Sequence, residues 1–132
     1  MGWLLDANAV IAIMRDPRGP VARRVREHGG EDIQVSAIVW HELSFGAFRS
    51  QRSGLNLHRL ERLDFPILPF DAEDARTAGA IRAELVRRGT PIGPYDLLIA
   101  GQARARGLTL VTRNIREFAR IPDLAVEDWE AP

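Results

Sequence analysis

The chain has 132 residues, and its 18 basic side chains balance 18 acidic ones, so the formal net charge at pH 7 is zero. This length predicts a single domain spanning residues 1–132, and the zero net charge excludes a protein that coats nucleic acid through general basicity. The chain has no cysteine, which excludes disulfides, thiolate zinc sites and cysteine nucleophiles.

The first half of the chain alternates short apolar runs with segments of helical spacing. Gly29 and Gly30 predict the end of the second helix, and Ser36 is a good N-cap for the third. Pro66 and Pro69 flank the short strand at 67–68, which places that strand near an edge of the sheet. In chain order we expect a strand at 3–5, helices at 6–14 and 21–27, a strand at 33–35, helices at 36–52 and 55–63, and a strand at 67–68.

The second half continues the alternation. Strands that alternate with helices predict an α/β fold with a mainly parallel central sheet, and such sheets bind ligands outside the carboxyl ends of their strands. We expect a helix capped by Asp71 and ended by Gly89, a helix at 95–106 ended by Gly107, a strand at 108–112, a helix at 115–118 and a strand at 124–126. The first of these helices has a predicted buried stripe of Ala75, Ala78, Ile81 and Leu85.

Four polar side chains lie at or soon after the expected strand-to-helix junctions, or at the start of a helix. Asp6 follows the first strand, and Glu42 lies about two turns into the helix after the second. Asp96 begins a helix after a Gly-Pro loop, and Asn114 follows the strand at 108–112. Such positions can converge at one edge of a parallel sheet.

Each of the four residues also has a simpler explanation. Asp6 can serve as a helix cap, and Asp96 as a first-turn acid favoured by the helix dipole. Glu42 can pair with an Arg, and Asn114 is a common turn residue. The prediction of a site therefore depends on the set and on its place in the fold.

A cluster of carboxylates calls for a cation. Two like charges at about 4 Å repel by roughly 4 kcal/mol at an effective dielectric of 20, and a divalent cation reverses that sign. Oxygen ligands without Cys or clustered His favour Mg²⁺ or Mn²⁺ over Zn²⁺. Such an ion suits phosphodiester cleavage, because it can activate water, hold the phosphate and stabilise the leaving oxygen.

Four segments of the chain resemble, in order, the motifs of PIN-domain nucleases. They lie at 4–8, 35–43, 91–100 and 110–118, and the tail at 124–129 resembles that of VapC-type toxins. The resemblance covers essentially the whole chain and implies a three-layer α/β/α PIN-like domain. It also implies a toxin of a type II toxin–antitoxin system, an endoribonuclease that uses Mg²⁺ or Mn²⁺ to cut tRNA or rRNA.

The resemblance assigns the catalytic set by position. Asp6 and Asp96 would be the principal metal ligands, and Glu42 would complete the acidic set directly or through water. Asn114, the fourth catalytic residue, stands where the family often has Asp. It keeps a carbonyl oxygen without the charge, which weakens the case for a second tightly bound metal.

Three further residues near the fourth motif are candidates for substrate binding. Thr112 would hold the phosphate or a bound water, and Arg113 and Arg116 would contact phosphates. Either Arg can equally be a solvated surface residue.

The resemblance also implies partners. It implies a homodimer, a cognate VapB-type antitoxin whose C-terminal segment covers the site, and toxin–antitoxin hetero-oligomers. Asp6 interrupts the first apolar run too early for a signal peptide, and no apolar run approaches the roughly 20 residues that span a bilayer. We therefore expect a cytoplasmic protein without membrane contact.

Two alternatives stay open at this point. One is a binding protein that has kept the fold and lost turnover, which Asn114 would explain. The other is a metal-dependent hydrolase that acts on other phosphoesters.

Several remaining residues have structural explanations. Acids in the first turn of a helix act as caps, and this accounts for Asp71, Glu73 and Asp74. The tail acids are expected to be solvated; they are Glu127, Asp128 and Glu130. Three aromatic residues are expected mainly in the core, although some of them, with Leu57 and Leu60, could instead form a dimer or antitoxin-binding groove; they are Trp40, Phe45 and Phe48.

Overall fold

The computed structural model describes residues 2–28 and 32–131, in which seven helices and five strands alternate. Gly29 and Gly30, the predicted end of the second helix, lie outside the described residues. The elements are β1 (Trp3–Leu5), α1 (Ala7–Arg15), α2 (Pro20–Glu27), β2 (Ile33–Ser36), α3 (Ala37–Arg49), α4 (Ser53–Glu61), β3 (Ile67–Leu68), α5 (Ala72–Arg87), α6 (Pro94–Arg106), β4 (Thr109–Val111), α7 (Ile115–Phe118) and β5 (Val126–Glu127).

The five strands form one sheet with the order β3-β2-β1-β4-β5, and every neighbouring pair is parallel. β3 is an edge strand, as its flanking prolines predict. The chain builds outward from β1 to β2 and β3, and then crosses back to place β4 on the other side of β1. This reversal is a topological switch point, which in parallel sheets leaves a crevice at the carboxyl ends of the central strands.

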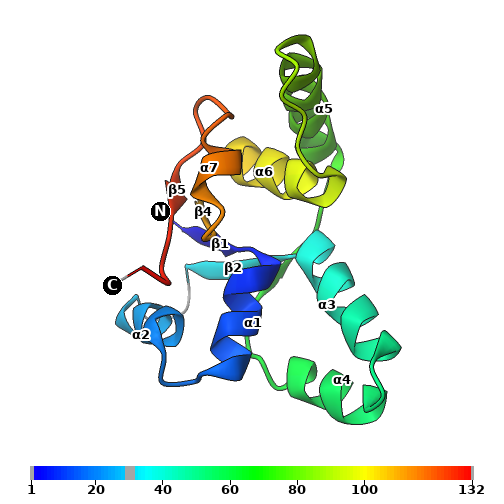
Figure 1. Ribbon diagram of the computed structural model, residues 1–132, viewed down its shortest axis with the longest axis vertical. Helices are drawn as coiled ribbons and strands as arrows, with labels where there is room; N and C mark the ends of the chain where they lie inside the picture. The colour runs from blue at the N-terminus through cyan, green and yellow to red at the C-terminus, as the bar shows by residue number, and fades with distance from the viewer. Residues whose placement is uncertain (1, 29–31, 132) are drawn as a thin grey trace.

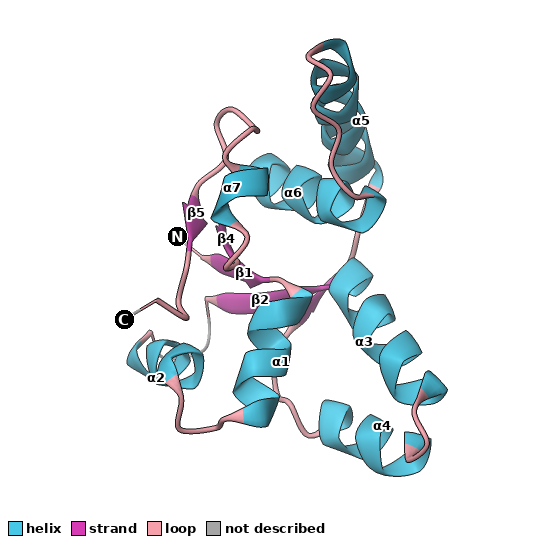
Figure 2. Cartoon of the chain, viewed as in Figure 1, coloured by secondary structure: helices cyan, strands magenta, loops and turns pink. Residues whose placement is uncertain are grey.

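Helices cover both faces of the sheet, which confirms the expected three-layer α/β fold (Figure 1). In Figure 2, α5 and α6 lie on one side of the strands, and α1 and α2 lie on the other. The core between the layers is made of the apolar strand residues and one stripe of each large helix. Leu4, Leu5, Ile33 and Leu110 are fully buried within it. Among the described residues, no helix is long and apolar enough to cross a membrane.

Two predictions about the helices are wrong in detail. α3 ends at Arg49 instead of reaching residue 52, because Ser50 adopts an extended backbone and its hydroxyl donates to the Ala47 carbonyl at 2.7 Å. In α5, Ala75 is exposed, and Asp74 takes the buried place ahead of Ala78. A pattern of apolar residues alone cannot locate a buried carboxylate.

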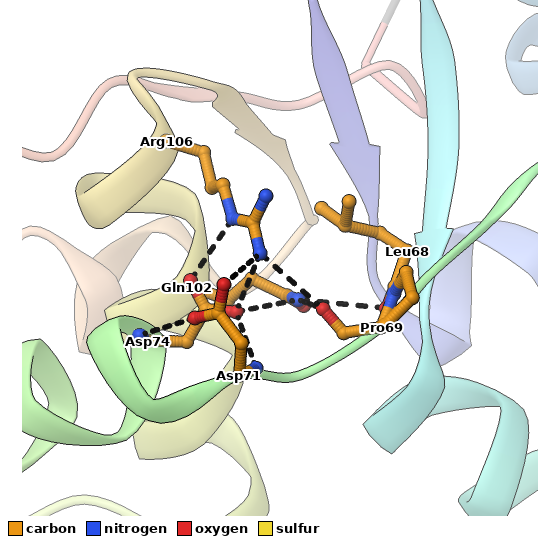
Figure 3. A network of polar contacts seen from close by, with 6 residues as sticks. All are labelled: Leu68, Pro69, Asp71, Asp74, Gln102 and Arg106. Atoms are coloured by element: carbon orange, nitrogen blue, oxygen red, sulfur yellow. Dashed lines mark hydrogen bonds and ion pairs between the residues drawn. The ribbon is translucent and has the colours of Figure 1, made fainter.

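The buried Asp74 belongs to a polar network that joins α5, α6 and the end of β3 (Figure 3). Asp74 and Asp71 cap α5 reciprocally, which confirms the capping interpretation for this pair. Asp74 also accepts hydrogen bonds from Arg106 Nε at 3.0 Å and from Gln102 Nε2 at 3.2 Å. Gln102 Nε2 further donates to the Pro69 carbonyl at 2.9 Å. The network fixes the α5–α6 pair to the edge strand of the sheet.

Candidate active site

The candidate site begins where the three central strands end. Leu5 of β1 is in register with Val35 of β2 and Val111 of β4. The next residues, Asp6, Ser36 and Thr112, therefore stand at one level across the sheet, and all three are buried. The rule for parallel sheets thus places a polar row at this edge.

Asp6 is the N-cap of α1, and its Oδ1 accepts a hydrogen bond from Ala9 N at 2.8 Å. The capping explanation is therefore correct, and it leaves the other carboxylate oxygen for a second role. Burial raises the pKa of Asp6, while hydrogen bonds from the Thr112 hydroxyl and from Ala9 N oppose that rise. The cap thus holds a buried carboxylate in one orientation at the carboxyl end of β1.

Glu42 projects from α3 beside the apolar face that Val39 and Leu43 bury. Its Oε1 is buried without a hydrogen-bond partner among the described residues. Burial raises its pKa, and the negative charges of Asp96 and Asp6 raise it further. No Arg of the described chain forms an ion pair with Glu42, so the ion-pair explanation does not apply.

Asp96 lies in the first turn of α6, directly after the Gly93-Pro94 loop. Burial, the charges of Glu117 and Asp6, and a hydrogen bond with the Glu117 carboxyl group together raise its pKa to about 6. A hydrogen bond between two carboxyl groups needs a proton on one of them. Asp96 therefore lies in the most strongly perturbed part of the acidic group.

Glu117 is a member of the site that the sequence reasoning did not assign. Its Oε2 accepts a hydrogen bond from Asn114 Nδ2 at 2.9 Å, and its Oε1 accepts one from Gly93 N at 3.4 Å. The available signal was its place three residues after Asn114, since residues at that spacing share one face of a helical turn. This contact also joins Asn114 to the site. An ionised Asp at position 114 would repel Glu117, whereas the Asn amide donates a hydrogen bond to it.

Thr112 and Asn114 form one hydrogen-bonded turn. The Thr112 hydroxyl donates to Asp6 and accepts from Asn114 N at 3.0 Å. Thr112 is only 1% exposed. Its expected contact with a substrate phosphate or a bound water stays a prediction.

The acids gather at one edge without forming a closed ligand set. Glu42 and Asp96 each feel the charge of Asp6, so the three carboxylates interact electrostatically. Yet in residues 2–28 and 32–131 no three His, Asp or Glu side chains are close enough to hold one ion as they stand. The chemistry of the group still fits a hard cation, because Glu42 Oε1 is a buried oxygen that lacks a partner.

The two candidate substrate Arg residues lie on the exposed side of this edge. Arg113 Nε is 3.9 Å from Glu130 Oε2, while Arg116 has no ion pair with another described residue.

The tail acids are partly as predicted. Glu127 is exposed, as expected of a solvated acid, and it also accepts hydrogen bonds from Trp129 Nε1 at 3.0 Å and from Trp3 Nε1 at 3.4 Å. Asp128 and Glu130 are instead half-buried beside Trp129, which is buried and packs against Trp3 of β1.

A groove lies between α1, α3 and α4 and reaches Glu42. It has a volume of about 550 Å³. Phe45 and Phe48, which we expected mainly in the core, are 58% and 67% exposed on α3. The residues that line the groove are Ile11, Met14, Arg15, Glu42, Leu43, Gly46, Ala47, Asn56, Arg59 and Leu60.

Comparison with known proteins gives one consistent family. A family model described as the PIN domain matches residues 3–124. The chain is 41% identical over 131 residues to the tRNA(fMet)-specific endonuclease VapC of Shigella flexneri, covering 96% of this chain and 97% of that protein. It is 36% identical to ribonuclease VapC2 of Haemophilus influenzae, covering 96% and 97%.

Solved structures agree with this family in fold. The DNA-bound VapBC structure from Salmonella typhimurium matches with a TM-score of 0.92 at 39% identity, covering 98% of both chains. VapBC-1 from nontypeable Haemophilus influenzae matches with a TM-score of 0.89 at 32% identity, covering 99% of this chain and 100% of that one.

Proposed function

We propose that this chain, which belongs to the PIN-domain family and within it to the VapC ribonucleases of toxin–antitoxin systems, cuts RNA at the carboxylate edge described above. The single observation that carries the proposal is the buried Glu42 Oε1, which has no hydrogen-bond partner among the described residues and which lies on an acid that the charges of Asp96 and Asp6 also act on. Three carboxylates that repel one another in a partly buried crevice favour a divalent cation.

The roles of the site residues follow from their environments. Asp6 and Asp96 would hold a Mg²⁺ or Mn²⁺ ion, and Glu42 would contribute through its unpartnered oxygen, directly or through water. When bound, the ion would supply positive charge to the phosphate and leaving oxygen. Glu117 and Asn114 would position Asp96, and Thr112 would position Asp6.

Asn114 does not argue for a chain that has lost turnover. Its amide group donates to Glu117, which an Asp at this position could not do in its ionised form. Asn is therefore the suitable residue beside Glu117. A relative named as a tRNA-specific endonuclease supports tRNA as the substrate class, which in turn implies a cytoplasmic protein.

The partner we propose is a VapB-type antitoxin seated in the groove between α1, α3 and α4. The groove is partly apolar, it is rimmed by Arg15 and Arg59, and it reaches Glu42. A peptide lying there would approach the acidic edge, and an Arg from it would neutralise the carboxylates. VapBC structures from relatives contain both proteins by name, which supports a hetero-oligomer here.

We also propose a homodimer that uses the exposed aromatic face of α3. Phe45 and Phe48, three positions apart on α3, each expose a large apolar side chain that a monomer would leave in water. Sedimentation of the purified chain should give a dimer at micromolar concentration, and the F45S/F48S double variant should give a monomer. A wild-type monomer would contradict the dimer.

The function is tested by cleavage of tRNA with the purified chain. Asp6→Asn and Asp96→Asn should each lower the Mg²⁺-dependent rate by at least about 100-fold, the usual effect of removing one essential electrostatic or acid–base group. Asp64→Asn, an exposed acid before β3, is the matched control. Calorimetry should show Mn²⁺ binding by the wild-type chain and weaker binding by both site variants. Undiminished cleavage by either site variant would exclude the proposed mechanism.

A further inference from the structure

A second, smaller pocket is lined by none of the three site acids Asp6, Glu42 and Asp96. It lies between one face of α1, the start of α2 and the C-terminal tail, with a volume of about 250 Å³. This volume is less than half that of the groove between α1, α3 and α4, which is about 550 Å³. The pocket is therefore suited to a small group.

Two guanidinium groups border this pocket. Arg15 is exposed at the end of α1 and forms no hydrogen bond or ion pair through its side chain with the described residues. Arg113, from the turn after β4, has a side chain that is 64% exposed, and its ion pair with Glu130, at 3.9 Å, is the only one it forms with a described residue. Its positive charge also lowers the pKa of Asp6, whose rise comes mainly from burial. Arg113 therefore lies between the pocket and the site.

The Glu130 carboxylate occupies this position because the tail is anchored behind it. Trp129 is 1% exposed and packs against Trp3 and His28. Glu130 N then donates to Asp128 Oδ1 at 2.8 Å, which orients the last turn. The Glu130 charge acts on Asp6 and pairs only loosely with Arg113. A rotation of this one side chain would release Arg113 without moving the anchored tail.

Asp16 is a second acid that lines the pocket, and its carboxylate is hydrogen-bonded within its own turn. Its Oδ1 accepts from Arg18 N at 3.2 Å, and Gly19 N donates to its backbone carbonyl at 2.9 Å. Asp16 keeps its charge at the pocket, and displacement of Glu130 would leave the guanidinium groups of Arg15 and Arg113 facing that one acid and the pocket. Such groups bind phosphate oxygens in a bidentate manner.

We propose that this pocket binds the nucleotide next to the scissile phosphate of an RNA strand, with Arg15 and Arg113 contacting its phosphates and Glu130 as the anion that an RNA phosphate displaces. The inference rests on the proposed function, because it places the cut bond at the neighbouring acidic edge. Glu130 then weakens the binding of any RNA that does not supply a phosphate at this position.

The test is RNA binding without cleavage. The probe is a fluorescein-labelled RNA stem-loop, titrated with the full chain in EDTA and followed by anisotropy at several salt concentrations. Arg15→Ala and Arg113→Ala should each weaken binding and reduce the slope of log K against log salt by about 0.7 to 1. Glu130→Gln should tighten binding about two- to fivefold, the range expected for an exposed ion pair.

Matched controls lie on α5, remote from the pocket. Arg76→Ala and Glu73→Gln change the same charges at exposed positions and should leave binding within the error of wild type after a common electrostatic correction. The proposal is overturned if the two pocket Arg variants bind RNA like R76A, or if E130Q binds no more tightly than E73Q. Weakened antitoxin binding with unchanged RNA binding would assign the pocket to the protein partner and also overturn it.

The subsite and the proposed function fail separately. A chain that cuts RNA with Mg²⁺ but shows no effect of the pocket variants has the function without this subsite. A chain that shows the predicted binding pattern but does not cut RNA keeps the RNA subsite and loses the function.

Discussion

Replacing Asp96 by Asn should stabilise the fold while abolishing cleavage. The pKa of Asp96 rises from 3.8 to about 6 on folding, so the folded chain binds this proton more tightly than the unfolded chain. The free energy of unfolding therefore falls as pH rises from about 4 to 6. At pH 7 Asp96 is ionised and the full loss of stability has been reached. A pKa difference of about 2 corresponds to about 3 kcal/mol.

That figure is an upper bound, because Asp96 is only half-buried and solvent screens its charge. Screening reduces the cost to about 1.5 kcal/mol, and loss of a favourable charge at the start of α6 removes about 0.5 kcal/mol of the gain. D96N should therefore be about 1 kcal/mol more stable at pH 7.5, which is about 3–4 °C in Tm for a chain of this length.

The assay is thermal unfolding of wild type, D96N and D64N in EDTA at pH 7.5 and pH 4.5. The gain of D96N should shrink to about a third at pH 4.5, where most of the wild-type carboxyl is already protonated in the folded state. D64N should match wild type at both values. A destabilised D96N, or a gain independent of pH, would refute the account of Asp96 as a desolvated and repelled carboxylate.

Three further perturbations test other parts of the molecule. Glu117→Gln should lower the pKa of Asp96 below about 6, because a neighbouring charge and a carboxyl hydrogen bond disappear; carbon-detected NMR titration in EDTA measures it, and an unchanged value would exclude the contact. Arg106→Ala should destabilise the fold by about 2–4 kcal/mol in urea unfolding, because it leaves the fully buried Asp74 unpaired, with R106K losing less. Gly101→Ala should cost about 1–3 kcal/mol, because its Cβ would lie 2.5 Å from a side chain of α5; a wild-type Tm would show that the α5–α6 contact is looser.

Much of the fold follows from short stretches of sequence. The caps at Asp6, Ser36 and Asp71 form where the residue types predict them, and Gly107 ends α6 in the left-handed conformation. Each of these features involves residues within a few positions of one another, so the sequence alone contains the necessary information. The order of strands and helices then directs attention to the carboxyl ends of the strands.

Other features depend on how the elements pack. Asp74 is buried because Arg106, more than thirty residues later, reaches it across the α5–α6 interface. Phe45 and Phe48 are exposed because α3 packs through its other face. Apolar spacing measures which residues prefer burial, and it does not say how much apolar surface the fold has room to cover.

The sequence by itself determined the types and order of the elements and the positions of the three acids along them, because periodicity, capping and strand-end position are local properties. Only the tertiary structure decided that Glu117 pairs with Asp96 and that the tail carries Glu130 to Arg113. Those contacts join residues from separate elements. Their existence depends on helix packing angles and on the anchoring of Trp129, which no single stretch of the chain encodes.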